Sequence, residues 1–257
     1  MNPRALLTLG LMLSAAGQAN ADSLVLSSGS EPVTLVELFT SEGCNSCPPA
    51  DRHLSNLTTD KGLWRDFVPL AFHVDYWDYL GWQDRFANAD YSDRQRRYAL
   101  EGGVRVVYTP GFFAGGKEWR NWRRDGLPAE ASGMPGVLRA EVTTDTVNVH
   151  WDGETTDAQP LASVALLGMS LSSSVKAGEN RGKKLRHDFV VLDVTSASLT
   201  PVEDGYAVSA PLPESSVGAE QFAIAVWVTD GRTQAPLQAT GGYLPTGWPK
   251  PGLIETE

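Results

Sequence analysis

The two cysteines of the chain, Cys44 and Cys47, lie in the segment "TSEGCNSCPPAD" at residues 40–51. Two thiols at this spacing can form a small disulfide, supply two ligands to a metal ion, or act as a redox couple. A thiolate at the start of a helix is stabilised by backbone N–H groups and by the helix dipole. The redox interpretation therefore predicts Cys44 as an exposed nucleophile and Cys47 as the buried thiol that resolves a mixed disulfide.

Other uses of the pair have less support in the sequence. Structural zinc needs about four ligands, and no second C-x-x-C accompanies the four histidines. A purely structural disulfide at this spacing would close a very small loop and stabilise the fold little. A Cu(I) chaperone using Cys44, Cys47 and His73 suits the softness of thiolates, but the chain has only four methionines. A redox-inert adaptor stays open as a further alternative. We therefore expect no metal. We also expect no organic cofactor, because no glycine loop suited to phosphate is present.

The elements around the cysteines alternate in type between Pro32 and about Trp122. The apolar runs at 33–40 and 67–77 predict strands, and apolar residues spaced i, i+4, i+7 after Cys47 predict a helix that tolerates Pro48 and Pro49 in its first turn. A second helix is predicted from Ser92, with Gln95 in capping-box spacing, to Gly102. This alternation indicates an α/β domain over residues 30–132.

The second half of the chain has a different texture. Short alternating apolar runs separated by turn residues predict a smaller, sandwich-like all-β domain over 136–240, followed by a surface tail at 241–257. His187 and "GENRGKK" at 178–184 are best explained as a polar turn between strands. The alternative is that this loop returns over the first domain and helps to define its substrate.

The order strand, C-x-x-C at a helix start, strand, helix and then "YTPGFFAGG" resembles the thioredoxin fold. That resemblance implies a cis-proline at Pro110, with Thr109 offering backbone hydrogen bonds to a substrate chain. It also implies that a buried carboxylate on the first strand relays the proton of the resolving thiol. Glu37 is the matching acid, although it lies seven rather than six residues before Cys44. A simple ion pair with Lys or Arg is the alternative role for Glu37.

A narrower resemblance covers nearly the whole mature chain. The segments "VELFTSEGCNSCPPAD", "LAFHVDYWDYLGW", "RQRRYA", "VYTP" and "GENRGKKL" together resemble a secreted bacterial thioredoxin-like family catalogued as a domain of unknown function. That family often has Gln after the Thr-Pro pair; this chain has Gly111, which lacks the side chain for a substrate contact of that kind.

The segment "FHVDYWDYLGWQDRF" is rich in aromatic and ionisable residues. The carboxyl ends of parallel strands meet at one edge of a sheet, so we expect this segment to lie beside the cysteines. Asp75, Tyr76 and Trp77 are predicted to form a substrate-facing rim. His73 is better explained as a core histidine bonded to a carboxylate.

The first 21 residues have the features of a secretory signal peptide: a positive start, a short apolar stretch and a small-x-small cleavage site. We therefore expect a periplasmic or secreted protein. The formal net charge is −10 and no block of Lys and Arg is present, which argues against nucleic acid and anionic membrane as partners. No later segment predicts a stable membrane anchor. The expected partners are protein or small-molecule thiols and disulfides; direction of transfer and oligomeric state are left open.

Overall fold

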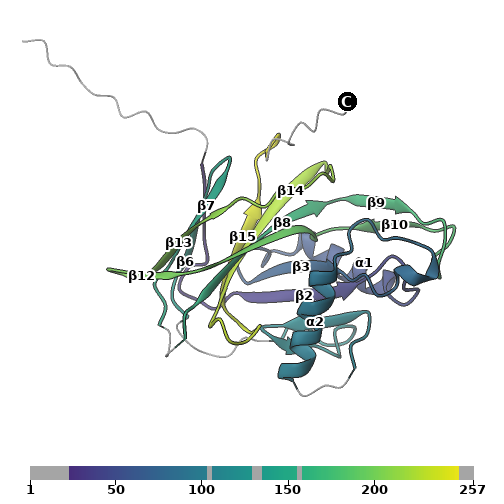
Figure 1. Cartoon of the computed structure of the whole chain (residues 1–257), viewed down its shortest axis with the longest axis horizontal. Helices are drawn as coiled ribbons and strands as arrows, with labels where there is room; N and C mark the ends of the chain where they lie inside the picture. Colours follow the sequence, from purple (N-terminus) through teal and green to yellow (C-terminus); the bar gives the residue numbers. More distant parts are fainter. Residues whose placement is uncertain (1–22, 103–105, 129–134, 155–157, 249–257) are drawn as a thin grey trace, which may run out of the picture.

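The computed structural model describes residues 23–102, 106–128, 135–154 and 158–248. The predicted signal peptide lies outside these residues. Strands account for 42% and helices for 13% of the structure. The predicted fold class is therefore wrong: the chain is not an α/β thioredoxin-like domain followed by a separate small sandwich, but a mostly β structure built on large sheets (Figure 1).

An eight-stranded sheet contains strands from both halves of the chain, in the order β15-β14-β8-β11-β3-β2-β4-β5. Its members are β2 (Thr34–Thr40), β3 (Phe67–His73), β4 (Gly111–Ala114), β5 (Lys117–Glu118), β8 (Leu161–Met169), β11 (Val190–Ser198), β14 (Gln221–Thr229) and β15 (Pro236–Tyr243). Strands β2 and β3 are parallel, and β11 joins the free edge of β3 where Ala71 N–H donates to the Phe189 carbonyl at 2.8 Å. An unpaired apolar edge would be unstable, and this pairing explains why two separate domains do not form.

A five-stranded sheet, in the order β1-β6-β7-β13-β12, packs on part of the large sheet. It contains β1 (Leu24–Ser27), β6 (Leu138–Val142), β7 (Thr146–Trp151), β12 (Thr200–Val202) and β13 (Gly205–Pro211). Residues of β14 alternate between two cores: Trp227 packs with the helical side, and Val226 and Val228 pack with the five-stranded sheet. Burial on both faces explains the continuous apolar runs of the second half.

Two α-helices lie in the described part of the chain, both near β2 and β3 (Figure 1). Helix α1 (Pro48–Asn56) begins directly after Cys47 with its two prolines at N1 and N2, as predicted. Helix α2 (Ala89–Glu101) begins earlier than predicted, because Asn88 caps it by accepting the Asp90 N–H. Ser92 and Gln95, expected to form the cap, are instead buried. Single-turn 3-10 helices occupy Leu57–Thr59 and Asp78–Leu80.

The remaining strands, β9 (Leu171–Ser174) and β10 (Lys184–His187), form a separate antiparallel hairpin. The hairpin packs against α1, so it reaches the region of the cysteines. At the other end of the chain, the predicted surface tail is wrong in its first residues: 241–243 belong to β15 and Leu244 is buried.

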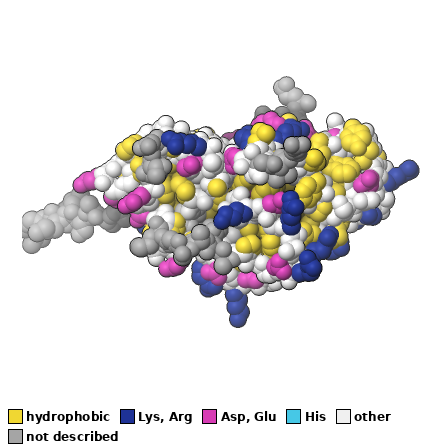
Figure 2. Space-filling view, turned by 90° about the horizontal axis from the view of Figure 1, so that it is seen from below, with side chains coloured by type: hydrophobic (Ala, Val, Ile, Leu, Met, Phe, Trp, Pro, Cys, Tyr) yellow, Lys and Arg dark blue, Asp and Glu magenta, His cyan; other side chains and the backbone are white. Residues whose placement is uncertain are grey.

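The molecular surface mixes side chains of both charges. On the face shown in Figure 2, Lys and Arg are interspersed with Asp, Glu and hydrophobic side chains. Large apolar side chains that are strongly exposed include Tyr79, Leu100 and Val106. Within the described residues, no helix has the length and apolar character needed to cross a bilayer.

Candidate functional site

The cysteine pair lies in the turn that links β2 to α1. Cys44 and Cys47 are at disulfide distance, with their Cα atoms 5.5 Å apart. Cys47 is the N-cap residue of α1, and its carbonyl accepts the N–H groups of Ala50 and Asp51 at 2.8 and 3.1 Å. In this state Cys44 is 1% exposed and Cys47 is fully buried. The prediction that Cys44 is an exposed nucleophile is therefore wrong for the disulfide form.

Short local contacts shape this turn. Ser41 Oγ accepts the Gly43 N–H at 3.0 Å, and the Ser41 carbonyl accepts the Cys44 N–H at 3.2 Å. Cys44 Sγ lies 3.2 Å from Ser46 Oγ. A Cβ on Gly43 would lie 2.9 Å from Trp77 Cβ, so only glycine allows the turn to pack closely on that tryptophan.

The Thr109–Pro110 segment reaches the same turn from farther along the chain. Its peptide bond is cis, as the resemblance implies. The Thr109 carbonyl accepts a long hydrogen bond from Ser46 Oγ at 3.4 Å, and Thr109 Oγ1 accepts the indole N–H of Trp77 at 2.8 Å. The structure thus brings Thr109 and Trp77 to the cysteines.

The two other rim residues are held mainly by α2. Asp75 accepts a hydrogen bond from Ser92 Oγ, and its own backbone N–H donates to that hydroxyl at 3.2 Å. Tyr76 donates from its hydroxyl to Gln95 Oε1 at 3.0 Å. Burial raises the pKa of Tyr76 to about 12. These contacts make Asp75 and Tyr76 supports of the β3–α2 connection, with the buried polar residues of α2 as their partners.

Glu37 lies on the face of the sheet opposite to α1. Side chains three positions apart on a strand point to opposite faces, and Thr40 of the same strand contacts Asp51 of α1. The Glu37 carboxylate instead accepts Arg94 Nε at 2.6 Å and the Tyr98 hydroxyl, both from α2. The sheet therefore separates Glu37 from the cysteine turn, and the ion pair with an arginine is the role that it has in this structure.

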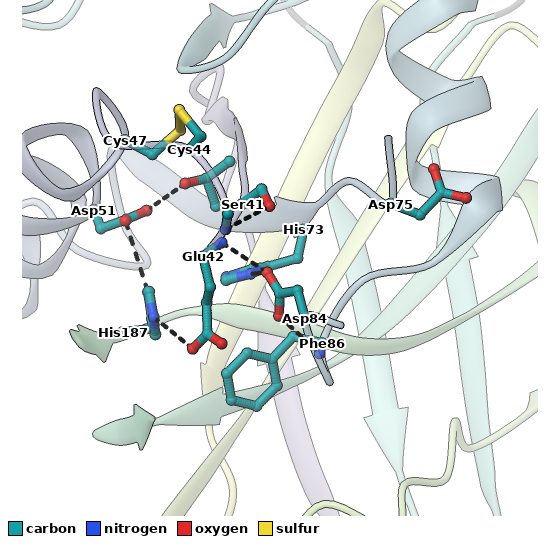
Figure 3. Close-up of polar contacts among 12 residues, drawn as sticks. Ser41, Glu42, Cys44, Cys47, Asp51, His73, Asp75, Asp84, Phe86 and His187 are labelled. Atoms are coloured by element: carbon teal, nitrogen blue, oxygen red, sulfur yellow. Dashed lines mark hydrogen bonds and ion pairs between the residues drawn. A yellow bond between two sulfur atoms is a disulfide. The ribbon is translucent and has the colours of Figure 1, made fainter. Parts of the chain in front are cut away.

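A buried cluster of ionisable side chains lies beneath the cysteines (Figure 3). Its members are Glu42, Asp51, His73, Asp84 and His187, each at most 6% exposed. Asp51 Oδ1 accepts the Thr40 hydroxyl at 2.7 Å, and Asp51 Oδ2 lies 3.8 Å from His187 Nδ1. His187 Nε2 lies 3.2 Å from Glu42 Oε1. Asp51 thus connects the helix that carries Cys47 to the β9–β10 hairpin.

The second half of this cluster is an ion pair between β3 and the loop that follows it. His73 Nδ1 lies 2.6 Å from Asp84 Oδ2, which also accepts the Glu42 N–H at 2.9 Å. Burial disfavours the charged form of His73, but the Asp84 carboxylate outweighs it, so the pKa of His73 is raised. Burial likewise opposes ionisation of Asp84, yet His73 and the backbone N–H donors lower its pKa. His73 is a core histidine bonded to a carboxylate, as predicted.

The pKa values of the other two carboxyl groups of the cluster are shifted in opposite directions. Burial raises the pKa of Asp51, and the nearby histidines and the Thr40 hydroxyl do not overcome it. For Glu42, burial acts in the same direction, but the His187 hydrogen bond and other contacts leave the pKa lowered. Asp51 is therefore the group of this cluster best placed to hold a proton near Cys47.

Sequence reasoning missed the carboxylates beneath the cysteines. Asp51 follows Cys47 by four residues, one helical turn, and that spacing was the available signal. Glu42 stands within the cysteine turn itself. Nothing local marks Asp84 or His187, which join the cluster through tertiary contacts.

The loop at 178–184 is more than a polar turn between strands. Asn180 Nδ2 donates to the carbonyls of Glu42 and Cys44, each at 2.8 Å. The Glu179 carboxylate accepts the Asn45 N–H at 2.9 Å. The alternative considered for this loop, a return over the first half of the chain, describes its position correctly.

A metal site is not evident in the described part of the chain, where no group of three or more His, Cys, Asp and Glu is arranged to hold an ion. What the arrangement offers instead is a disulfide at a helix N-terminus, a peptide segment beside it, and, one helical turn away, a buried carboxyl whose pKa is raised.

Comparison with known proteins identifies the family. The chain belongs to the family described as protein of unknown function (DUF1223), whose model matches residues 35–229. The narrower resemblance to a family of unknown function is thereby confirmed, whereas the thioredoxin-like resemblance gains no support from this match. None of the curated proteins matches the chain.

Two solved structures are similar. A crystal structure of a protein from Agrobacterium tumefaciens has 28% identity and a TM-score of 0.54, over 82% of this chain and 94% of that one. HBP35 of Porphyromonas gingivalis has 13% identity and a TM-score of 0.53, over 88% of this chain and 79% of that one. At 13% identity, the second likeness concerns the fold alone.

Proposed function

We propose that this protein is a thiol–disulfide oxidoreductase that acts outside the cytoplasm through Cys44 and Cys47. The observation that carries the proposal is the position of the pair at the N-terminus of α1, with Thr109 beside it and Asp51 beneath it. Helix N-termini stabilise thiolates, and a buried carboxyl can supply or accept the proton that disulfide chemistry requires. The proposal rests on this local arrangement and not on the class of the fold.

In the exchange step, the thiolate of a partner attacks Cys44 Sγ and forms a mixed disulfide. The Cys44–Cys47 bond breaks, and Cys47 leaves with the bonding electrons as a thiolate. Asp51 then gives its proton to Cys47, and the reverse reaction returns that proton to Asp51. Thr109 and Trp77 form the wall along which the partner chain would lie. Because both sulfurs are buried, the turn must open before a partner reaches Cys44.

Trapping tests this function directly. A Cys47→Ala variant cannot resolve a mixed disulfide, so its Cys44 is expected to accumulate covalent partners in the periplasm or the medium. Mass spectrometry after non-reducing separation identifies them. The Cys44→Ala variant is the matched control, because it lacks the proposed attacking thiol and keeps only the resolving one. Equal adduct levels in the two variants, or none in well-expressed Cys47→Ala, would refute the proposal.

Replacement of Asp51 by asparagine is expected to slow reduction of the disulfide by dithiothreitol about tenfold to a hundredfold at pH 6. The reason is that asparagine keeps the hydrogen bond with Thr40 but cannot donate the proton that Cys47 takes up. Quenching by alkylation at timed intervals, followed by mass measurement, gives the rate. Asp145→Asn removes an exposed carboxylate and should leave the rate unchanged. Equal rates for both variants would exclude Asp51 from proton transfer.

A second candidate function has one observation in its favour, the burial of both sulfurs. In this alternative the protein is a binding protein, and its disulfide only holds the turn between β2 and α1. It predicts no trapped partners and a reduction potential below about −300 mV, as for structural disulfides. The Cu(I) alternative gains no support, because the described residues hold no group of three or more His, Cys, Asp and Glu arranged to bind an ion.

A further inference from the structure

Residues 175–183 connect β9 to β10 and form the hairpin tip. Two hydrogen bonds close it: the Val175 N–H donates to the Lys183 carbonyl at 3.0 Å, and the Gly182 N–H donates to the Val175 carbonyl at 2.8 Å. Gly178 has φ +68°, and a Cβ there would lie 3.9 Å from Gly43 Cα. The hairpin tip is therefore a tight turn packed directly on the cysteine turn.

Asn180 holds the hairpin tip in place. It is fully buried, and its amide donates to the carbonyls of Glu42 and Cys44 at 2.8 Å each. Its Oδ1 accepts Lys183 Nζ, also at 2.8 Å. Every polar atom of this side chain is engaged, so Asn180 fixes where its neighbour Glu179 lies.

Glu179 accepts a hydrogen bond from an N–H group that would otherwise be free to stabilise a thiolate at Cys44. Its carboxylate accepts the Asn45 N–H at 2.9 Å, between the two cysteines and just before α1. Free N–H groups at this position stabilise a negative sulfur at Cys44, whereas a carboxylate there satisfies one of them and adds a negative charge. Glu179 therefore destabilises a thiolate at Cys44, and it thereby disfavours the reduced, dithiol form of the pair.

Other charges around the turn do not offset this contact to the same degree. The hairpin tip also carries the exposed cations Lys176 and Arg181, and Lys183, which is bound to Asn180. Below the turn, Glu42 is hydrogen-bonded to His187, and burial raises the pKa of Asp51, which disfavours its charged form. Among these groups, Glu179 is the one whose charge is hydrogen-bonded to the backbone between the cysteines.

We propose that the hairpin tip sets the redox poise of the cysteine pair: Glu179, positioned by Asn180, favours the disulfide over the dithiol. The biological meaning of this inference rests on the proposed function. The effect itself concerns only the equilibrium between the disulfide and dithiol forms of Cys44 and Cys47. Removing the carboxylate frees the Asn45 N–H and makes Cys44–Cys47 a stronger oxidant, since stabilising a thiolate stabilises the reduced form.

The test is the equilibrium with glutathione at pH 7. Two glutathione thiols supply two electrons and two protons; their sulfurs join as glutathione disulfide while the Cys44–Cys47 bond breaks. Glu179→Gln keeps an oxygen acceptor and removes the charge, and Glu179→Ala removes both. We expect the equilibrium constant to shift toward the dithiol about threefold for Gln and up to about tenfold for Ala, the latter equal to about 30 mV. The shift for Gln should shrink in 1 M salt.

Three further variants complete the design. Asn180→Ala should shift the equilibrium in the same direction, and adding Glu179→Ala to it should change little more, because both act through one contact. Glu203→Gln, in the turn after β12 at the far end of the molecule from α1 in Figure 1, is the matched charge control and should have no effect. Shifts below twofold in both Glu179 variants, or shifts toward the disulfide, would overturn the inference.

The outcome is separable from that of the proposed function. The glutathione equilibrium reads the cysteine couple without any natural partner. A shifted equilibrium together with no trapped partners would support the effect of Glu179 on the redox equilibrium and refute the oxidoreductase function. An unshifted equilibrium together with trapped partners would refute the effect of Glu179 and support the oxidoreductase function.

Discussion

Replacement of Arg94 by leucine is expected to lower the free energy of unfolding by about 3–5 kcal/mol, the usual cost of leaving a buried charge without its partner. Arg94 Nε lies 2.6 Å from Glu37 Oε1, and Glu37 is fully buried. The guanidinium also lies over the rings of Phe72 and Trp227, at 5.4 and 5.2 Å. The variant therefore loses packing between α2 and the large sheet as well as an ion pair.

Urea unfolding followed by tryptophan fluorescence measures this loss. Arg97→Leu is the matched control, since Arg97 is exposed on the same helix, and it should change stability by no more than about 0.5 kcal/mol. The double variant Glu37→Leu/Arg94→Leu should recover part of the loss, because it removes both charges. If Arg94→Leu and Arg97→Leu unfolded at the same urea concentration, the structural role assigned to Glu37 would be wrong.

Asp84→Asn is expected to cost about 2–4 kcal/mol, because it leaves the buried His73 without its carboxylate. The pH dependence follows from the two pKa shifts. The pKa of His73 is raised from 6.5, so its contribution is complete below pH 6.5 and is lost as pH rises through the folded-state value. The pKa of Asp84 is lowered from 3.8, so its contribution is present above pH 3.8 and is lost as pH falls through the folded-state value.

The difference in unfolding free energy between the wild type and Asp84→Asn should therefore be greatest between about pH 4 and pH 6.5. It should decrease at lower and at higher pH. Urea midpoints measured from pH 3 to pH 9 test this shape. Asp93→Asn, which alters an exposed ion pair on α2, should give a small difference with no maximum in that window. A difference that is constant over the whole range would mean that His73 is not charged in the folded protein.

Local patterns predicted the elements near the cysteines well. The apolar runs became β2 and β3, and the prolines after Cys47 occupy the first turn of α1. The start of α2 was misplaced because Ser92 and Gln95 match a capping box, yet their side chains are used by Asp75, Tyr76 and the Tyr108 carbonyl. A capping motif indicates where a helix can start, and tertiary partners decide whether its side chains are free to cap.

The fold class was wrong for a long-range reason. Alternating strand and helix patterns in the first half predicted a self-contained α/β unit. Nothing in these patterns shows that no strand of the first half covers the outer edge of β3. Strand β11, from the second half, pairs with β3 at Ala71 and merges the two halves into one sheet. The Glu37 assignment failed in a related way, since the strand was correct but the identity of the face against α1 was not available from sequence.

The sequence by itself determined that two cysteines occupy the junction between a buried strand and a helix, because strand burial and the tolerance of proline in a first helical turn are local properties. Only the tertiary structure decided which groups surround them. Asp51 rather than Glu37 lies with the cysteines because strand side chains alternate between faces. Asn180 and Glu179 reach the turn from 136 and 134 residues away in the chain, a contact that follows from how the β9–β10 hairpin packs on α1.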